Sequence, residues 1–241
     1  MDESRGSAGN GLSLGVLILG SLYWDNSVRE EWRRERLDLE RQLHVRAPIR
    51  YGRQSKQRGR SYTMVLSAGL READFGTAVV VPCKSRDLIE EAKSLWEAEG
   101  GTRGAVSGSW GCVGLLVNPE AGQPEHRDRW SEFVNGRPGY GRLAHAKGEL
   151  GAVDKAGLLT IDWPRRVRGS PLMLDALLAT ATDPTLVEGT RYPTPNEVAN
   201  AWDTSKGRES IRYFCDNRRN GIETFQDEGI AEHLRHLGHV C

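Results

Sequence analysis

The end of one predicted helix carries a carboxylate suited to proton transfer. Residues 85–101 predict a helix with one apolar face, formed by Leu88, Ile89, Ala92, Leu95 and Trp96. Glu99 continues this face, whereas Glu97 falls on the polar side. A helix C-terminus and partial burial both disfavour negative charge, so we expect the pKa of Glu99 to be raised towards the range useful in general acid–base catalysis. The alternative is a frayed terminal Glu that reaches water.

A second candidate is the turn after the first apolar run of the chain. Residues 16–19 predict a buried strand, and Gly20, Ser21 and Leu22 follow it directly. A Gly-Ser turn that leaves a strand presents backbone N–H groups, which can hold a carboxylate or a developing oxyanion. On its own, however, the same sequence is also common in ordinary tight turns.

A third candidate is the basic stretch RQSKQRGR, residues 53–60, which precedes an alternating segment typical of a strand. Ser55 and Arg58 therefore lie near the start of this strand, where Arg58 could pair with a substrate carboxylate. A solvated basic loop is the alternative interpretation.

The strands and helices predicted around these groups indicate an α+β protein. We expect a small, curled, mixed or antiparallel sheet, barrel-like in shape, flanked by helices and followed by a helical C-terminal part. The predicted strands are 16–19, 61–67, 75–82, 112–119 and 157–164. The predicted helices are 28–43, 85–101, 170–181, a helix that opens with the Thr194–Glu197 capping box, 211–214 and 230–237.

Length and composition indicate one main domain with additions at both ends. The chain has 241 residues, and we divide it into a flexible tail (1–11), a main domain (12–165) and a mainly helical extension (166–241) that can pack on the same core. Lys plus Arg and Asp plus Glu both number 33, which argues against binding to nucleic acid or to an anionic membrane. The apolar run 12–19 is too short to span a bilayer.

The cysteines favour a reducing compartment. Cys83, Cys112, Cys215 and Cys241 are scattered and form no C-x-x-C motif, so we interpret them as free thiols and predict a cytoplasmic protein.

Three motifs together resemble the γ-glutamylcyclotransferase superfamily, most closely its ChaC-type, glutathione-degrading branch. GSLYW, beginning at Gly20, is similar to the superfamily's Tyr-Gly-Ser-Leu-x-Trp loop. SKQRG, beginning at Ser55, resembles the Ser-x-x-His-Arg-Gly segment that precedes a strand in that branch. LWEAEGG resembles the Leu-x-x-x-Glu-Gly helix end that carries the catalytic Glu. The resemblance covers about residues 14–120 and rests on the order and spacing of the motifs.

The resemblance implies a γ-glutamylcyclotransferase-like fold and a specific reaction. In this reaction the α-amine of a γ-glutamyl group attacks its own γ-carbonyl, which releases an amine and 5-oxoproline. Glu99 would be the general acid/base, and neither a metal nor another cofactor would be needed. The partner would be a small γ-glutamyl substrate, and the C-terminal helices could form a homodimer. The implied substrate-binding residues are Leu19, Gly20, Ser21, Leu22, Tyr23, Trp24, Ser55 and Arg58, with the aromatic ones forming walls of the pocket.

The sequence differs from the family pattern at three points. Leu19 replaces the aromatic residue before Gly-Ser, Gln57 replaces the His, and no Tyr follows Glu99 closely. These differences keep open a non-catalytic ligand-binding or interaction module on the same fold. A metal site is a further alternative, because His233, His236, His239 and Cys241 lie close together in the sequence.

Overall fold

The computed structural model describes residues 12–55, 61–137, 139–145, 151–168, 172–204 and 208–241. A mixed sheet of six strands, in the order β6-β8-β1-β5-β2-β7, forms its centre. β1 runs parallel to β8, and the other neighbouring pairs are antiparallel. The strands are β1 Leu14–Ile18, β2 Leu43–Ala47, β5 Gly76–Pro82, β6 Gly111–Val117, β7 Arg165–Arg166 and β8 Ala176–Thr182. The α+β class is confirmed, and the sheet stays open, with β6 and β7 at its edges.

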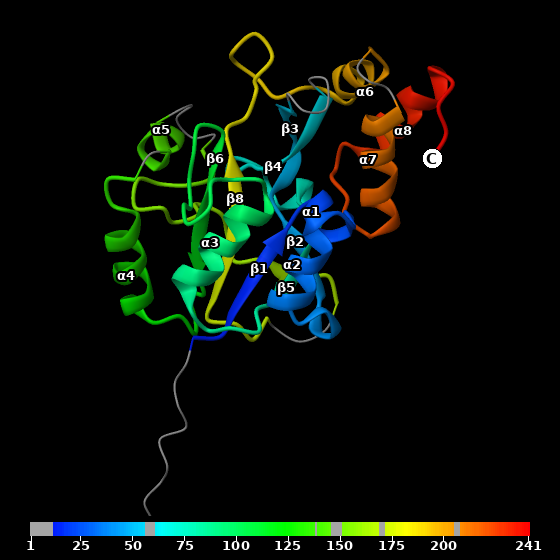
Figure 1. The fold of residues 1–241 in the computed structure, drawn as a ribbon. Helices are drawn as coiled ribbons and strands as arrows, with labels where there is room; N and C mark the ends of the chain where they lie inside the picture. The colour runs from blue at the N-terminus through cyan, green and yellow to red at the C-terminus, as the bar shows by residue number, and fades with distance from the viewer. Residues whose placement is uncertain (1–11, 56–60, 138, 146–150, 169–171, 205–207) are drawn as a thin grey trace, which may run out of the picture.

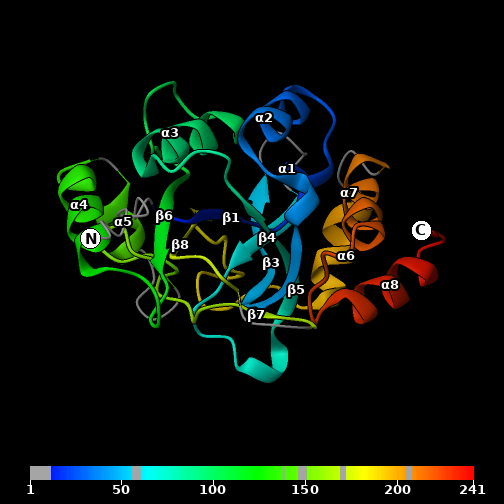
Figure 2. The ribbon, with the colours of Figure 1, turned by 90° about the horizontal axis from the view of Figure 1, so that it is seen from below.

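The helices flank this sheet in three groups (Figures 1 and 2). The first group is α1 Ser21–Trp24, α2 Val28–Arg36 and α3 Leu88–Ala98. The second is α4 Pro124–Val134 and α5 Tyr140–His145, on the side of β6. The third is α6 Pro195–Thr204, α7 Arg208–Arg219 and α8 Asp227–His236, at the opposite end of the molecule. Short 3₁₀ turns occur at Leu39–Arg41 and Glu72–Asp74.

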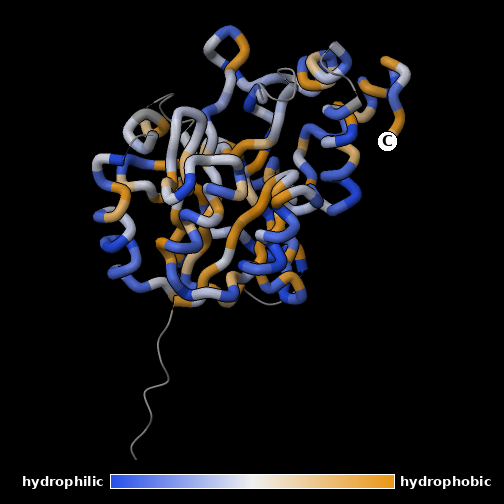
Figure 3. The backbone as a smooth tube through the Cα atoms, in the orientation of Figure 1, coloured by the Kyte–Doolittle hydropathy of each residue, from blue (hydrophilic) through white to orange (hydrophobic). Residues whose placement is uncertain are grey.

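A separate antiparallel hairpin, β3 Ile49–Ser55 and β4 Ser61–Leu66, rises beside the sheet. Apolar residues continue along β1 through the middle of the molecule (Figure 3). All five residues of β1 are buried. In β5 every residue except Thr77 is buried. The core therefore lies on both faces of the central strands, and it fixes the ends of β1 and β8.

Those two ends decide where a site can form. Val16 pairs with Leu178 in the parallel register, so continuation of both strands brings their carboxyl ends to the same edge of the sheet. In sheets that contain parallel strands, the crevice outside these ends is the usual place for a ligand. The turn at Gly20 and the last residues of β8 are thereby brought together.

The helix predicted at 170–181 is wrong, because residues 176–182 form the central strand β8. A short apolar run is ambiguous by periodicity, and here the segment is buried on both faces between β6 and β1. Residues beyond 166 thus supply a central strand of the sheet as well as three helices.

Two further predicted elements differ from the structure. The helix predicted over 28–43 ends at Arg36, because Leu37 pairs with Cys83 in an isolated bridge and Leu43 begins strand β2. The strand predicted over 157–164 is not formed, although Leu158 and Leu159 make isolated bridges there. The strand within 75–82 and the helix after the Thr194–Glu197 capping box are confirmed.

The prediction that all cysteines are free thiols is wrong, because Cys215 and Cys241 form a disulfide. Cys215 lies in α7 and Cys241 follows α8, so the packing of the last helices brings together residues 26 positions apart. Cys83 and Cys112 are not disulfide-bonded. Because two of the four cysteines are paired, the cysteines no longer support a cytoplasmic location, which stays a prediction. No helix in the described ranges is long and apolar enough to cross a membrane.

Candidate functional site

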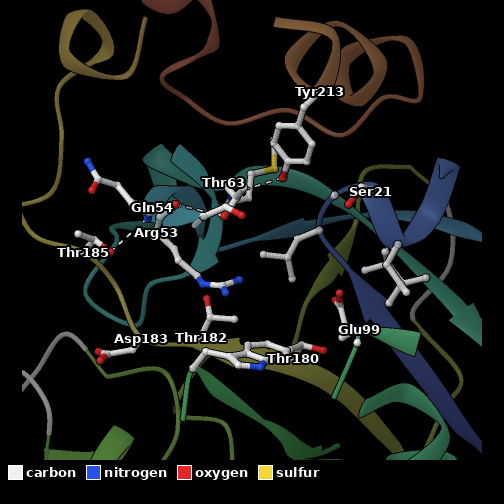
Figure 4. A pocket seen from close by; sticks show the side chains of 18 of the residues that line it. Ser21, Arg53, Gln54, Thr63, Glu99, Thr180, Thr182, Asp183, Thr185 and Tyr213 are labelled. Atoms are coloured by element: carbon white, nitrogen blue, oxygen red, sulfur yellow. Dashed lines mark hydrogen bonds between the residues drawn. The ribbon is translucent and has the colours of Figure 1, made fainter. Parts of the chain in front are cut away.

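A cavity of about 590 Å³ lies where β1 and β8 end. Its walls come from the β1–α1 turn, the C-terminus of α3, the β3–β4 hairpin, the end of β8 and one side chain of α7. Figure 4 shows Ser21 and Glu99 on one side of this space and Arg53 pointing in from the other. The sequence motifs around residues 20 and 99 thus meet in one cavity.

Glu99 is held at the cavity by the way α3 ends. It is the C-cap residue, and its backbone N–H donates to Leu95 O at 3.1 Å. Gly100 follows with φ of 85°, a left-handed conformation that suits glycine and turns the chain out of the helix. The Glu99 side chain is 23% exposed. Glu99 therefore lines the cavity from the end of α3.

Arg29 connects Glu99 to the β1–α1 turn. Its guanidinium lies 3.5 Å from Glu99 Oε2 and donates to Ser21 Oγ at 2.7 Å. It also pairs with Asp25 at 3.2 Å and donates to Ala98 O at 3.3 Å. Arg29 therefore holds the Glu99 carboxylate and the Ser21 hydroxyl close to each other. No sequence pattern distinguishes Arg29 from the other charged residues of α2.

The turn itself depends on Gly20. Its φ is 152°, and a Cβ at this position would lie 2.7 Å from the Tyr213 hydroxyl. Both conditions exclude larger side chains, so the turn can approach Tyr213 only because residue 20 is glycine. Leu19, Gly20, Ser21 and Leu22 all line the cavity.

Tyr23 and Trp24 do not line the cavity, so the expectation that they form its walls is wrong. The Tyr23 hydroxyl donates to Gln42 Oε1 at 2.6 Å, and Trp24 Nε1 donates to Asn217 Oδ1 at 2.7 Å. Both side chains point away from the site because α1 is a helical turn, which sends successive residues in different directions. They fix α1 to the rest of the molecule.

Tyr213 supplies an aromatic wall that the sequence did not reveal. It comes from α7, is buried, and its hydroxyl accepts from the Met64 N–H at 3.4 Å. Its ring packs against Trp24, with ring centroids 5.9 Å apart. No spacing rule connects residue 213 to the β1–α1 turn, so only the tertiary structure reveals this contact.

Arg53 is the cation on the hairpin side of the cavity. Its guanidinium lies over the Trp110 ring at 5.0 Å, and Trp110 stacks on Trp96 of α3 at 4.3 Å. Ser55, predicted to bind substrate, is buried and also lines the cavity. Arg58, the predicted recognition residue, falls outside the described residues.

The end of β8 adds hydroxyl groups that the sequence analysis missed. Thr180 and Thr182 line the cavity, and their buried Oγ1 atoms have no hydrogen-bond partner among the described residues. A buried hydroxyl without a partner costs about 1–3 kcal/mol, so these atoms are suited to meet a ligand. The sequence did not point to the two threonines because this segment was predicted as a helix, and in a helix residues two apart do not share a face.

The predicted alternative metal site is not formed in the described part of the chain. Cys241 is disulfide-bonded, His233 contacts Asn200 Oδ1 at 2.9 Å, and His239 pairs with Asp203 at 2.7 Å. The two histidines attach α8 and the C-terminal segment to α6, and the disulfide attaches Cys241 to α7.

The sequence matches no protein-family model and no curated protein. A crystal structure of a yeast γ-glutamyl cyclotransferase specific to glutathione is similar in fold, with 14% sequence identity and a TM-score of 0.47. The similarity covers 94% of this chain and 100% of the yeast chain. A similarity at this level of identity and TM-score does not assign a family or a site.

Proposed function

We propose that this protein cleaves a γ-glutamyl amide by intramolecular cyclisation, with release of 5-oxoproline and an amine. The observation that supports this proposal is that Glu99 and the turn 19–22 line one cavity, connected by Arg29. These are the positions that the sequence resemblance links to this chemistry. The γ-glutamylcyclotransferase superfamily and its ChaC-type branch remain part of the proposal.

In the proposed reaction, Glu99 moves one proton. Its carboxylate accepts a proton from the substrate α-amine as the α-nitrogen forms a bond to the γ-carbonyl carbon. The amide C–N bond then breaks, and Glu99 delivers the proton to the departing nitrogen. Nucleophile and electrophile belong to one molecule, so correct folding of the substrate supplies much of the rate.

The β1–α1 turn would stabilise negative charge. The first N–H groups of a helical turn have no partner within the helix, and α1 begins at Ser21. We assign the backbone N–H groups of Gly20, Ser21 and Leu22 to the substrate carboxylate or to the oxyanion. Arg29 positions both this turn and Glu99 through the contacts described above.

The decisive experiment is to measure 5-oxoproline release from glutathione, γ-glutamyl amino acids and γ-glutamylated amines. The Glu99→Gln variant should lose release with every active substrate while its circular dichroism spectrum is retained. Glu97→Gln is the matched control, because Glu97 lies on the same helix and is exposed. Turnover by Glu99→Gln would refute the assignment.

A binding module is the second candidate, because Glu99 is already engaged by Arg29 in the structure. Thermal stabilisation of the wild-type protein by γ-glutamyl compounds, without 5-oxoproline, would support this alternative.

A further inference from the structure

A second cavity, of about 160 Å³, lies between α7 and α8. Its floor is apolar and contains Ile211, Phe214 and Leu234, all of them buried. Cys241 forms part of the wall and is joined to Cys215 of α7 by the disulfide. We propose that this disulfide is a thiol-exchange site, at which a small anionic thiol becomes attached to Cys241. The proposal is independent of the reaction proposed above.

The segment after α8 is fixed at this cavity by side-chain contacts at two of its residues. Gly238, with φ of 87°, follows the end of α8 in a left-handed conformation and turns the chain out of the helix. His239 Nε2 then lies 2.7 Å from Asp203 Oδ1, and Cys241 is bonded to Cys215. Figure 1 shows this segment beside α7. Exchange at the disulfide therefore removes the covalent link between the segment and α7.

The two sulfur atoms of the disulfide differ in access, which helps to decide which of them a thiolate attacks. Cys215 is only 7% exposed, whereas Cys241 is exposed and lines the cavity. A group added to Cys215 would have to fit into a packed helix interface, but a group added to Cys241 can occupy the cavity. A cavity of about 150 Å³ can hold a benzene molecule, so the available volume is sufficient for a small thiol.

The exchange is balanced without a further oxidant or reductant. The incoming thiolate attacks Cys241 Sγ, the bond between the two cysteines breaks, and its electron pair stays on Cys215 Sγ. The new S–S bond joins the incoming sulfur to Cys241, and Cys215 takes a proton from solvent. The incoming thiol is thus oxidised to a disulfide, while Cys215 is reduced to a thiol.

Two arginines give the cavity its preference for negative charge. Arg218 and Arg235 both line it, and neither guanidinium has an ion pair or a hydrogen bond within the described ranges. Asp203 and Asp216, two carboxylates of the neighbouring helices, are paired with other side chains. Cations without a paired carboxylate attract anionic ligands and stabilise a thiolate. An anionic thiol is consequently preferred over a neutral or a cationic one.

The test compares an anionic thiol, 3-mercaptopropionate, with neutral 2-mercaptoethanol and cationic cysteamine. The folded protein is equilibrated with each thiol and quenched with acid, and the adduct is located by mass spectrometry of its peptides. Each equilibrium constant is divided by that of the same thiol with a small neutral disulfide, which removes intrinsic differences between the thiols. We expect the adduct on Cys241, favoured about 10-fold for the anionic over the neutral thiol at low salt, with the cationic thiol weakest. In about 1 M salt this preference should largely disappear.

Variants of the arginines test the origin of the preference. Arg218→Gln and Arg235→Gln should each lower it about threefold, and the two together should abolish it. Arg219→Gln is the matched control and should leave it unchanged, because Arg219 lies on the same helix as Arg218 but pairs with Asp216. Circular dichroism verifies that each variant is folded.

Four outcomes would overturn the exchange site: an adduct on Cys215, no adduct at any thiol concentration, equal constants for the three thiols, or an unchanged preference in the double arginine variant. The readout is the mass of the protein and its peptides, not release of 5-oxoproline. A failure of the proposed reaction would therefore leave this test unaffected.

Discussion

Arg29 contacts several groups around the cavity, including Ser21 Oγ at 2.7 Å, Ala98 O at 3.3 Å and Glu99 Oε2 at 3.5 Å. These contacts join a turn, a helix end and a carboxylate that are far apart in the sequence. Glu99, Ser55 and the turn 19–22 could be found from local sequence patterns. Arg29 and Arg53 could not, because an arginine on a charged helix or in a basic stretch of sequence has no distinguishing neighbourhood.

Replacement of Arg29 should therefore impair catalysis more than binding. In Arg29→Gln, the Glu99 carboxylate and the β1–α1 turn lose their common partner, and a displacement of about 1 Å can lower a rate by about 100-fold. We expect kcat for 5-oxoproline release to fall by about this factor, with a smaller change in KM. Arg34→Gln, an exposed arginine of the same helix, is the control. An unchanged kcat in Arg29→Gln would contradict the positioning role.

Gly20→Ala should destabilise the protein through two separate effects. Alanine is strained at φ of 152°, and its Cβ would lie 2.7 Å from the Tyr213 hydroxyl. The strain alone costs about 1–3 kcal/mol. Urea unfolding should show a larger loss than for Gly136→Ala, where φ is also positive but no atom lies within 4 Å of the added Cβ. Addition of Tyr213→Phe should recover part of the difference, and equal losses in the two glycine variants would disprove the contact.

The elements show why part of the fold could be predicted from the sequence and part could not. β5 and α3 have clear local signals: an apolar run that ends at Pro82, and an amphipathic face that ends at Gly100. β8 has no such signal, because a strand buried on both faces has neither alternation nor amphipathicity. Its wrong assignment also hid Thr180 and Thr182. The pairing of strands from distant segments, such as β1 with β8, is visible only in the folded sheet.

The disulfide should stabilise the C-terminal helices. It joins Cys215 of α7 to Cys241 after α8, and closure of such a loop contributes about 2–4 kcal/mol. Cys241→Ser should lower the free energy of unfolding by this amount, as measured with urea under non-reducing conditions. Dithiothreitol should produce the same loss in the wild-type protein and no further loss in the variant. A wild-type protein insensitive to reductant would contradict the prediction.

For the whole molecule, overall charge has little influence on stability near neutral pH. The formal net charge is zero and the isoelectric point is about 7.0, so pH effects must come from individual groups in unusual surroundings. Asp227, at the start of α8, is such a group. It is 3% exposed, and its Oδ1 accepts from the Thr224 N–H and hydroxyl, while Oδ2 has no partner among the described residues. Burial raises the pKa of Asp227 from 3.8 to about 7.

This raised pKa predicts that the wild-type protein becomes less stable as pH rises from about 4 to about 7. Over this range Asp227 stays protonated when folded but ionises when unfolded, so the native state binds more protons and the free energy of unfolding falls with pH. The loss is complete above the folded pKa. Asp227→Asn cannot ionise and keeps an acceptor for Thr224, so its stability should lack this pH dependence and exceed that of the wild-type protein by roughly 4 kcal/mol at pH 8. Urea unfolding of both proteins between pH 4 and 8 measures the difference, and parallel curves would show that Asp227 is ionised in the folded protein throughout.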